Sequence, residues 1–259
     1  MPARQPYPGT QTVVRAVALL KAFSDERPEL GLRELAQIAG LNKTTTYRLL
    51  TALESEGMLT RNRAGDAYRL GPEAIALGGR ALRSNDLRSA SRSALEALVD
   101  ATGETATLEV LIDDQVLILD EVTGQQHVLS MAQFVGTHWP SHATSTGKVL
   151  LAHLSDAQRK AVVRPRLSRY TPHTLTTLSR LRDELARVRA QGYATAIEEL
   201  ELGFVAVGAP VRNHDGTVVA AISLSGPSVR LAKDRLPSLA QLVVQSADRI
   251  SHQLGFTGG

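Results

Sequence analysis

The chain has 259 residues, of which 43% are hydrophobic and 21% are charged. The length favours two domains over one, and the composition is that of a globular protein, which excludes collagen-like, low-complexity and coiled-coil proteins. No apolar run approaches the roughly 18–20 residues that a membrane-spanning helix needs, so we expect no membrane partner. The N-terminus has no signal-peptide pattern and the chain has no cysteine. These features favour a cytoplasmic location and exclude disulfides, thiol nucleophiles and cysteine-based zinc sites.

Positive charge gathers in the first third of the chain. Residues 1–85 contain 12 Lys+Arg and 8 Asp+Glu, whereas residues 86–259 contain 17 and 18. An excess of basic residues at one end is typical of a module that faces nucleic acid and is joined to a nearly neutral domain.

Three helices are expected before residue 60. Apolar residues recur at helical spacing over 13–23, which predicts a first helix that ends near 24–28. Apolar residues at 32, 35, 38 and 41 predict a second, short helix that closes at Gly40, because glycine suits the backbone turn after a helix. Asn42 is the predicted N-cap of the third helix. The buried stripe of that third helix is formed by Thr46, Leu49, Leu50 and Leu53.

The second and third helices are expected to form a helix-turn-helix unit. Only residues 39–42 separate them, which is the turn length of such units. Beyond Gly57, residues 58–62 and 67–70 flank a turn at 64–66 and predict a β-hairpin. This hairpin would form a wing beside the helices.

The outward face of the third helix is polar. Three consecutive threonines, 44–46, are a poor choice for helix propensity, but their hydroxyl groups are good hydrogen-bonding groups. At a helix N-terminus directed into a major groove, such residues can contact base edges and phosphates, and nearby basic residues can contact phosphates. The alternative is a solvated helix face whose threonines only cap the helix. The candidate DNA-binding residues are Arg33, Lys43, Thr44, Thr45, Tyr47, Arg48, Thr51, Arg61 and Arg63.

The residues beyond 71 predict a second domain of helices and strands. Pro72 suits the first turn of a linker helix, and a further helix ends near Gly103. This order of elements indicates an α+β domain built on a largely antiparallel sheet. The expected hairpin strands are 106–112 and 116–122, the later helices are 148–153, 179–191 and 236–254, and the later strands are 193–197, 204–211 and 218–225.

The segment GLRELAQIAGLNKTTTYRLLTALESEGMLTRNRAGDAYRLG resembles the winged helix-turn-helix of the IclR family of bacterial transcriptional regulators. Four later segments resemble the effector-domain signatures of that family: SHATSTGKVLLAHL, RVRAQGYA, ELGFVAVGAPV and VVAAISLSGP. The resemblance implies a winged helix-turn-helix over 9–71, a linker helix over 72–85, and a GAF-like α/β effector-binding domain over 86–259. It also implies a repressor or activator that binds double-stranded DNA at a pseudo-palindromic operator and a small-molecule effector, without a cofactor. The expected assembly is a homodimer that pairs into a homotetramer.

Two serines on the last expected strand are candidate pocket residues. Side chains alternate across a sheet, so Ser223 and Ser225 project from one face. A buried hydroxyl without a partner costs about 1–3 kcal/mol, which implies a pocket or a hydrogen-bonded neighbour. The alternative is that both serines bond nearby backbone. The family resemblance implies effector contacts at both positions.

The loop over 141–148 precedes an apolar helix. Hydroxyl side chains and free N–H groups at the start of a helix suit an anion or a carboxylate, and ordinary N-capping explains the same residue types. The family resemblance implies effector contacts at Ser145 and Thr146.

Two positions depart from the family pattern. Several relatives have an aspartate where this chain has Ala196, and Trp139 stands beside the loop where an aliphatic residue is common. With Ala206, these residues complete the effector-binding candidates. We hypothesise that the pocket favours a larger or less polar ligand, such as an aromatic acid, over a two- or three-carbon keto acid. Trp139 is equally compatible with a core or interface position.

Three other interpretations of the sequence are a metal site, an enzyme and an architectural DNA-binding protein. His138 and His142 have the four-residue spacing of metal ligands, but Pro140 interrupts a helix there and no third ligand is evident. An enzyme is not expected, because the chain has no HExxH, GxSxG, GxGxxG or Walker A motif. A ligand-independent architectural DNA-binding protein would use 86–259 only to oligomerise, which leaves the serine pair unexplained.

Overall fold

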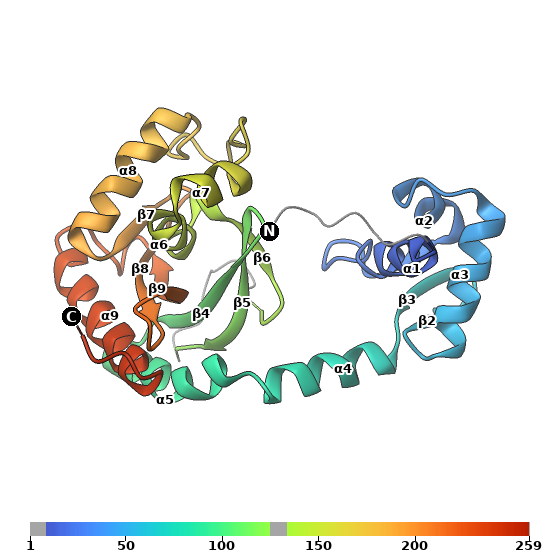
Figure 1. Ribbon diagram of the computed structural model, residues 1–259, viewed down its shortest axis with the longest axis horizontal. Coiled ribbons are helices and arrows are strands. Elements are labelled where there is room, and N and C mark those ends of the chain that lie inside the picture. The colour runs from blue at the N-terminus through green and yellow to red at the C-terminus, as the bar shows by residue number, and fades with distance from the viewer. Residues whose placement is uncertain (1–8, 125–133, 259) are drawn as a thin grey trace. The chain divides into compact units, whose positions relative to one another are not determined.

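The computed structural model describes residues 9–124 and 134–258, and the chain divides into two compact units (Figure 1). The first unit is Met1–Ser84 and the second is Asn85–Gly259. Within the described residues, no helix is both long and apolar enough to cross a membrane.

The first unit is helical with a small sheet. Its elements are α1 (Gln11–Leu20), β1 (Leu30–Gly31), α2 (Leu32–Ile38), α3 (Lys43–Ser55), β2 (Leu59–Arg61), β3 (Ala67–Leu70) and α4 (Pro72–Arg83). The sheet has the order β1-β3-β2 and is antiparallel throughout. Its core is formed by Leu19, Ala22, Leu30, Leu35, Leu49, Leu50, Leu59 and Tyr68.

The predicted helix-turn-helix is confirmed. Gly40 adopts φ +62°, a left-handed conformation that ends α2, and the Oδ1 of Asn42 accepts a 2.8 Å hydrogen bond from the N–H of Thr45 at the start of α3. Thr46 is fully buried, and its hydroxyl donates to the Asn42 carbonyl at 2.9 Å. The buried stripe therefore directs the remaining polar residues of α3 outward.

The first helix differs from its expected end. α1 ends at Leu20 rather than near 24–28, because Ser24 and Arg27 close a turn through reciprocal backbone hydrogen bonds. Val13 is 64% exposed, so the helical spacing identified the helix but not the face that it buries. The short strand β1 was not predicted. It pairs with β3 from the wing hairpin, which joins the wing to α2.

The helix α4 begins at Pro72, as predicted, and buries none of its residues. Gly71 precedes it where the chain passes very close to the wing: a Cβ at this position would lie 2.2 Å from the Gly57 carbonyl oxygen. Only glycine fits this crossing without a shift of the backbone.

The second unit is a six-stranded antiparallel sheet with helices on both faces, which confirms the expected α+β class. The strand order is β6-β5-β4-β9-β8-β7. Helices α5 and α9 cover one face, and α6 and α8 cover the other (Figure 1). Its elements are α5 (Asp86–Thr102), β4 (Thr105–Ile112), β5 (Gln115–Val122), β6 (His138–Pro140), a 3-10 turn (Ser141–Ala143), α6 (Ser145–His153), α7 (Asp156–Val162), α8 (Leu178–Gln191), β7 (Ala194–Ile197), β8 (Phe204–Arg212), β9 (Val218–Pro227) and α9 (Leu236–Gln253).

Most elements of the second unit match the prediction, and the short ones were missed. The hairpin of β4 and β5 turns at Asp113 and Asp114 as expected. α6 begins at Ser145, three residues before the expected start, so the polar loop residues lie in its first turn. β6 and α7 were not predicted, although Ser155 and Gln158 form a capping box at the start of α7.

Candidate functional site

The outward face of α3 is mostly exposed. Tyr47 is half exposed, and Lys43, Thr44, Arg48 and Thr51 are exposed as well, while Thr45 is half-buried. Within the described residues, the side chains of Lys43 and Arg48 have no hydrogen-bond or ion-pair partner. Their charges are therefore available to an external anion.

The three predicted arginines outside α3 fall into two groups. Arg33 on α2 and Arg63 at the tip of the wing are exposed, and their side chains have no partner in the part of the chain described here. Arg61 is exposed as well, but it has partners within the first unit. Its Nε lies 3.1 Å from Glu54 of α3, its Nη2 donates to the Tyr68 hydroxyl at 2.8 Å, and its guanidinium carbon lies 4.7 Å from the centre of the Tyr68 ring. Arg61 thus ties the wing to α3, a structural role that the sequence did not reveal.

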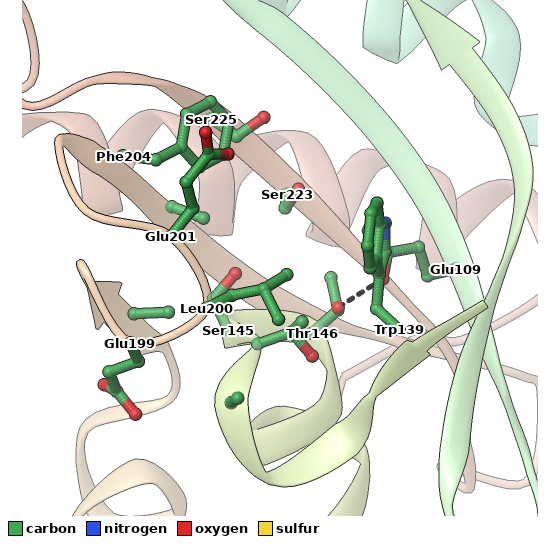
Figure 2. A pocket seen from close by; sticks show the side chains of 14 residues that line it. Glu109, Trp139, Ser145, Thr146, Glu199, Leu200, Glu201, Phe204, Ser223 and Ser225 are labelled. Atoms are coloured by element: carbon green, nitrogen blue, oxygen red, sulfur yellow. Dashed lines mark hydrogen bonds between the residues drawn. The ribbon is translucent and has the colours of Figure 1, made fainter. Parts of the chain in front are cut away.

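The seven effector-binding candidates line one pocket in the second unit (Figure 2). The pocket has about 430 Å³ of space not filled by atoms, its open mouth included. The candidates that line it are Trp139, Ser145, Thr146, Ala196, Ala206, Ser223 and Ser225, and they come from α6 and four different strands. Ala143 and Thr144 of the predicted loop also line the pocket, and the lining residues that sequence reasoning missed are Glu109, Glu199, Leu200, Glu201 and Phe204.

The strand β9 supplies the serine pair by alternation, as predicted. Ile222 and Leu224 lie in the core beneath α5 and α9, whereas Ser223 and Ser225 line the pocket on the opposite face. Both serines are almost fully buried. The Ser223 hydroxyl lies 2.8 Å from the hydroxyl of Thr107, and that of Ser225 makes only a long contact of 3.5 Å to the Thr105 carbonyl. The second serine therefore keeps most of its hydrogen-bonding capacity.

The first turn of α6 forms a second wall of the pocket. The hydroxyl of Thr144 accepts a hydrogen bond from the N–H of Gly147 at 3.2 Å, so this part of the loop is an ordinary N-cap. The N–H groups of Ser145 and Thr146 have no acceptor within the described residues, and they start the helix beside the pocket. Gly208 of β8 allows this approach, because a Cβ there would lie 3.0 Å from the Thr146 nitrogen. Two unused donors at a helix start suit a carboxylate oxygen.

Glu109 is a buried carboxyl group in the pocket wall. It is 5% exposed, and its two oxygens accept hydrogen bonds from Thr107 at 2.6 Å and from Thr146 at 2.5 Å. Burial raises the pKa of Glu109, and these two hydrogen bonds lower it by less. The signal that could have found this residue is the alternation of β4, which places Thr107 and Glu109 on the same face as the serines of β9.

A buried lysine stabilises the acidic side of the pocket. Lys148 is fully buried, and its Nζ donates to Glu184 at 3.0 Å, to Glu199 at 2.6 Å and to the Thr195 carbonyl at 2.5 Å. Burial raises the pKa of Glu199, and Lys148 opposes this shift. Among the described residues that line the pocket, the charged ones are all acidic. One carboxylate oxygen of Glu199 and one of Glu201 are buried without a partner in the described residues.

Aromatic residues stand at two ends of the pocket. Figure 2 shows Trp139 beside Glu109, and Phe204 together with Glu201 beside Ser225. Trp139 lies on β6 opposite Val116 and also packs against the core cluster of α6 and α8. This tryptophan is therefore both a pocket residue and a core residue. Ala196 is paired with Ala206 across β7 and β8, which leaves this side of the pocket without a polar side chain.

The two histidines considered as metal ligands have other surroundings. His138 is exposed on β6, whereas His142 is buried and has Nε2 2.9 Å from the Ser168 carbonyl oxygen. Burial lowers the pKa of His142. Over residues 9–124 and 134–258, no group of three or more His, Cys, Asp or Glu side chains is placed to hold a metal ion.

Known proteins share this architecture along nearly the whole chain. Residues 12–63 match the IclR helix-turn-helix domain, and residues 79–252 match the model for the bacterial transcriptional regulator IclR C-terminal domain. The chain is 32% identical to the HTH-type transcriptional regulator XynR of Escherichia coli K12, over 96% of this chain and 99% of the relative. It is 33% identical to the acetate operon repressor of Salmonella typhimurium, over 95% and 91% of the two chains.

Solved structures agree with these matches. A crystal structure of an IclR transcriptional regulator from Silicibacter sp. TM1040 superposes with a TM-score of 0.84 at 28% identity, covering 96% of this chain and 98% of that one. An IclR homolog from Microbacterium hydrocarbonoxydans, crystallised in complex with 4-hydroxybenzoate, gives a TM-score of 0.80 at 28% identity, covering 94% and 98%. These likenesses favour a regulator over the architectural and enzymatic alternatives. The chain belongs to the IclR family of bacterial transcriptional regulators, DNA-binding proteins with an effector-binding C-terminal domain.

Proposed function

We propose that this regulator recognises its operator through the exposed face of α3, with the wing beside it. The observation that supports this role is the pair of exposed cations, Lys43 and Arg48, which have no partner in the described part of the chain and lie on a helix whose opposite face is buried. Arg48 and the threonines would reach base edges, while Lys43, Arg33 and Arg63 would contact phosphates. Arg61 contributes by holding the wing in place.

Binding to DNA is tested with the upstream region of the regulator's own gene. Fluorescence anisotropy should give a tighter complex with a pseudo-palindromic segment of that region than with a random duplex of equal length at moderate salt. Equal affinity for both duplexes would contradict recognition by α3.

We further propose a homodimer that pairs into a homotetramer, with 72–85 as the linker between a DNA-binding domain over 9–71 and an effector domain over 86–259. A two-fold symmetric protein matches the symmetry of a palindromic operator, so two copies of α3 would occupy two half-sites. Effector binding would change the spacing of these copies through α4, with a coupling free energy of about 1–3 kcal/mol. Analytical ultracentrifugation with and without operator DNA tests the assembly, and a monomer on the DNA would contradict it.

The proposed effector is a small aromatic acid. Its carboxylate would accept hydrogen bonds from the N–H groups of Ser145 and Thr146, and its ring would lie between the aromatic residues at the two ends of the pocket, Trp139 and Phe204. The wall formed by Ala196 and Ala206 offers no polar side chain to a smaller keto acid. The observation that carries this proposal is the convergence of the unused helix donors and both aromatic residues on one pocket.

Calorimetry with 4-hydroxybenzoate, benzoate and pyruvate tests the effector class. We expect the two aromatic acids to bind more tightly than pyruvate, and Trp139→Leu to reduce this preference because it removes the aromatic wall. A preference for pyruvate in the unmodified protein would contradict the proposal. Analysis of the recovered ligand tests the enzymatic alternative, since a regulator returns its ligand chemically unchanged.

A further inference from the structure

Among the described carboxyl groups that line the pocket, only Glu109 is both almost fully buried and without an ion pair. Glu199 has Lys148 at 2.6 Å, whereas the partners of Glu109 are the neutral hydroxyls of Thr107 and Thr146. An ionised carboxylate in such surroundings loses its hydration without gaining a counter-ion. The neutral form is therefore the one that this wall accommodates best.

The charged groups around Glu109 do not compensate a negative charge. On α6, Lys148 directs its Nζ to Glu184, Glu199 and the Thr195 carbonyl. The segment after β7 contributes Glu199 and Glu201, which are acidic. On β6, His138 is exposed, and on β5 the buried Asp120 is paired with Arg88 and Arg92. In the register of the sheet, Glu109 lies opposite Ile118 of β5 and Ala221 of β9.

A hydrogen-bonded chain joins Glu109 to the proposed ligand-binding groups. Thr146 donates its hydroxyl to Glu109, as the dashed line in Figure 2 shows, and its N–H is one of the two unused donors at the start of α6. Thr107 links the other carboxylate oxygen to Ser223. Hydroxyl groups both donate and accept, so this chain accommodates Glu109 with or without its proton. A ligand carboxylate that accepts a hydrogen bond from the N–H of Thr146 would therefore be separated from the carboxyl group of Glu109 only by the Thr146 side chain.

We propose, as an extension of the proposed effector function on which it rests, that Glu109 takes up a proton when an organic acid binds, so that effector binding is coupled to the uptake of one proton. Two negative carboxylates that share a dry site repel each other, and one of them takes a proton to relieve the repulsion. The effector anion should therefore bind more weakly as the pH rises, at most about tenfold per pH unit for one coupled proton.

The same proton affects the unliganded protein. Because burial raises the pKa of Glu109, the folded state holds this proton more tightly than the unfolded state. The stability gained in this way is present below the ordinary glutamate pKa and is lost as the pH rises through the raised pKa. Glu109→Gln preserves the size of the side chain and removes its titratable proton. The unfolding free energy of this variant should therefore depend less on pH between the ordinary glutamate pKa and the raised pKa of Glu109.

The experiment compares 4-hydroxybenzoate with its uncharged analogue 4-hydroxybenzamide, by calorimetry from about pH 6 to pH 8. For the unmodified protein we expect the acid to lose affinity as the pH rises and the amide to keep it. Titrations in two buffers of different ionisation enthalpy should show proton uptake with the acid. Glu109→Gln should bind the acid with little pH dependence and no proton uptake, and Asp183→Asn, a matched carboxyl-to-amide change on the exposed surface of α8, should retain both effects.

The outcomes separate this inference from the effector proposal. If the acid binds with the same affinity across this pH range, or if Glu109→Gln still takes up a proton, the coupling is wrong while the effector class stands. If neither the acid nor the amide binds, the effector proposal fails and the coupling fails with it. Melting curves of Glu109→Gln at both ends of the pH range check that the variant is folded.

Discussion

The exposed face of α3 and the effector pocket are both polar surfaces, but the chain builds them in opposite ways. On α3, the basic side chains are exposed and have no partner among the described residues, while the apolar stripe beneath them carries the packing. In the pocket, the polar side chains are largely buried and several of them are hydrogen-bonded to one another, as in the chain from Ser223 through Thr107 and Glu109 to Thr146. Binding and folding should therefore be separable on α3 and coupled in the pocket.

The largest effect is expected for Lys148→Met. The change removes the cation from Glu184 and Glu199 and leaves two carboxylates close together in a largely buried place. We expect a loss of about 3–5 kcal/mol of unfolding free energy in the second unit. Urea unfolding followed by the fluorescence of Trp139, the only tryptophan, reports on that unit. Lys160→Met, an exposed change on α7, serves as the control. Equal stability of the two variants would contradict the view that folding depends on the buried polar groups beside the pocket.

Arg48→Ala should separate binding from folding most clearly. Loss of a base contact from arginine costs about 1–3 kcal/mol of operator binding, and we expect the unfolding free energy to change by less than about 0.5 kcal/mol. Anisotropy titrations with operator and random duplexes measure the first quantity, and thermal melting measures the second. Arg182→Ala, an exposed arginine on α8, controls for net charge. A destabilised Arg48→Ala protein would contradict the view that this face carries no packing.

A smaller effect is expected for the double change Ser223→Ala and Ser225→Ala. Each hydroxyl that bonds the effector contributes about 0.5–1.5 kcal/mol, so effector affinity should fall while operator binding without effector stays the same. Some stability should also be lost, because Ser223 bonds Thr107 in the buried chain. Calorimetry and melting test both quantities, with Ser179→Ala on the surface of α8 as the control. An unchanged effector response would show that the pocket is wrongly assigned.

The smallest effect is expected for Lys43→Ala, the proposed phosphate contact. Affinity should fall by the same factor for operator and random duplexes, and the slope of log affinity against log salt should decrease by about 1. Stability should not change. A loss confined to the operator would instead assign Lys43 to base recognition.

The sequence identified the residues that local rules govern. The cap at Asn42, the turn at Gly40, the serine pair of β9 and the polar start of α6 all follow from periodicity or from the chemistry of helix ends, and the structure has each of them. The end of α1 was wrong because a turn closed by Ser24 and Arg27 stops the helix, and apolar spacing carries no information about such a turn.

Residue patterns indicate the longer helices and strands, because such patterns repeat over a few neighbouring residues. The partners of the charged groups, in contrast, become known only when distant segments are placed side by side in the fold. Arg61 looked like a free phosphate contact, but Glu54 and Tyr68 hold it. Lys148 had no special signal in the sequence, yet it is neutralised by carboxylates 36 and 51 positions away. The alternation of β4 indicates the face on which Glu109 lies, but not that it is buried against a hydroxyl 37 positions away. The energy of a charge depends on its surroundings in space, and those surroundings come from distant parts of the chain.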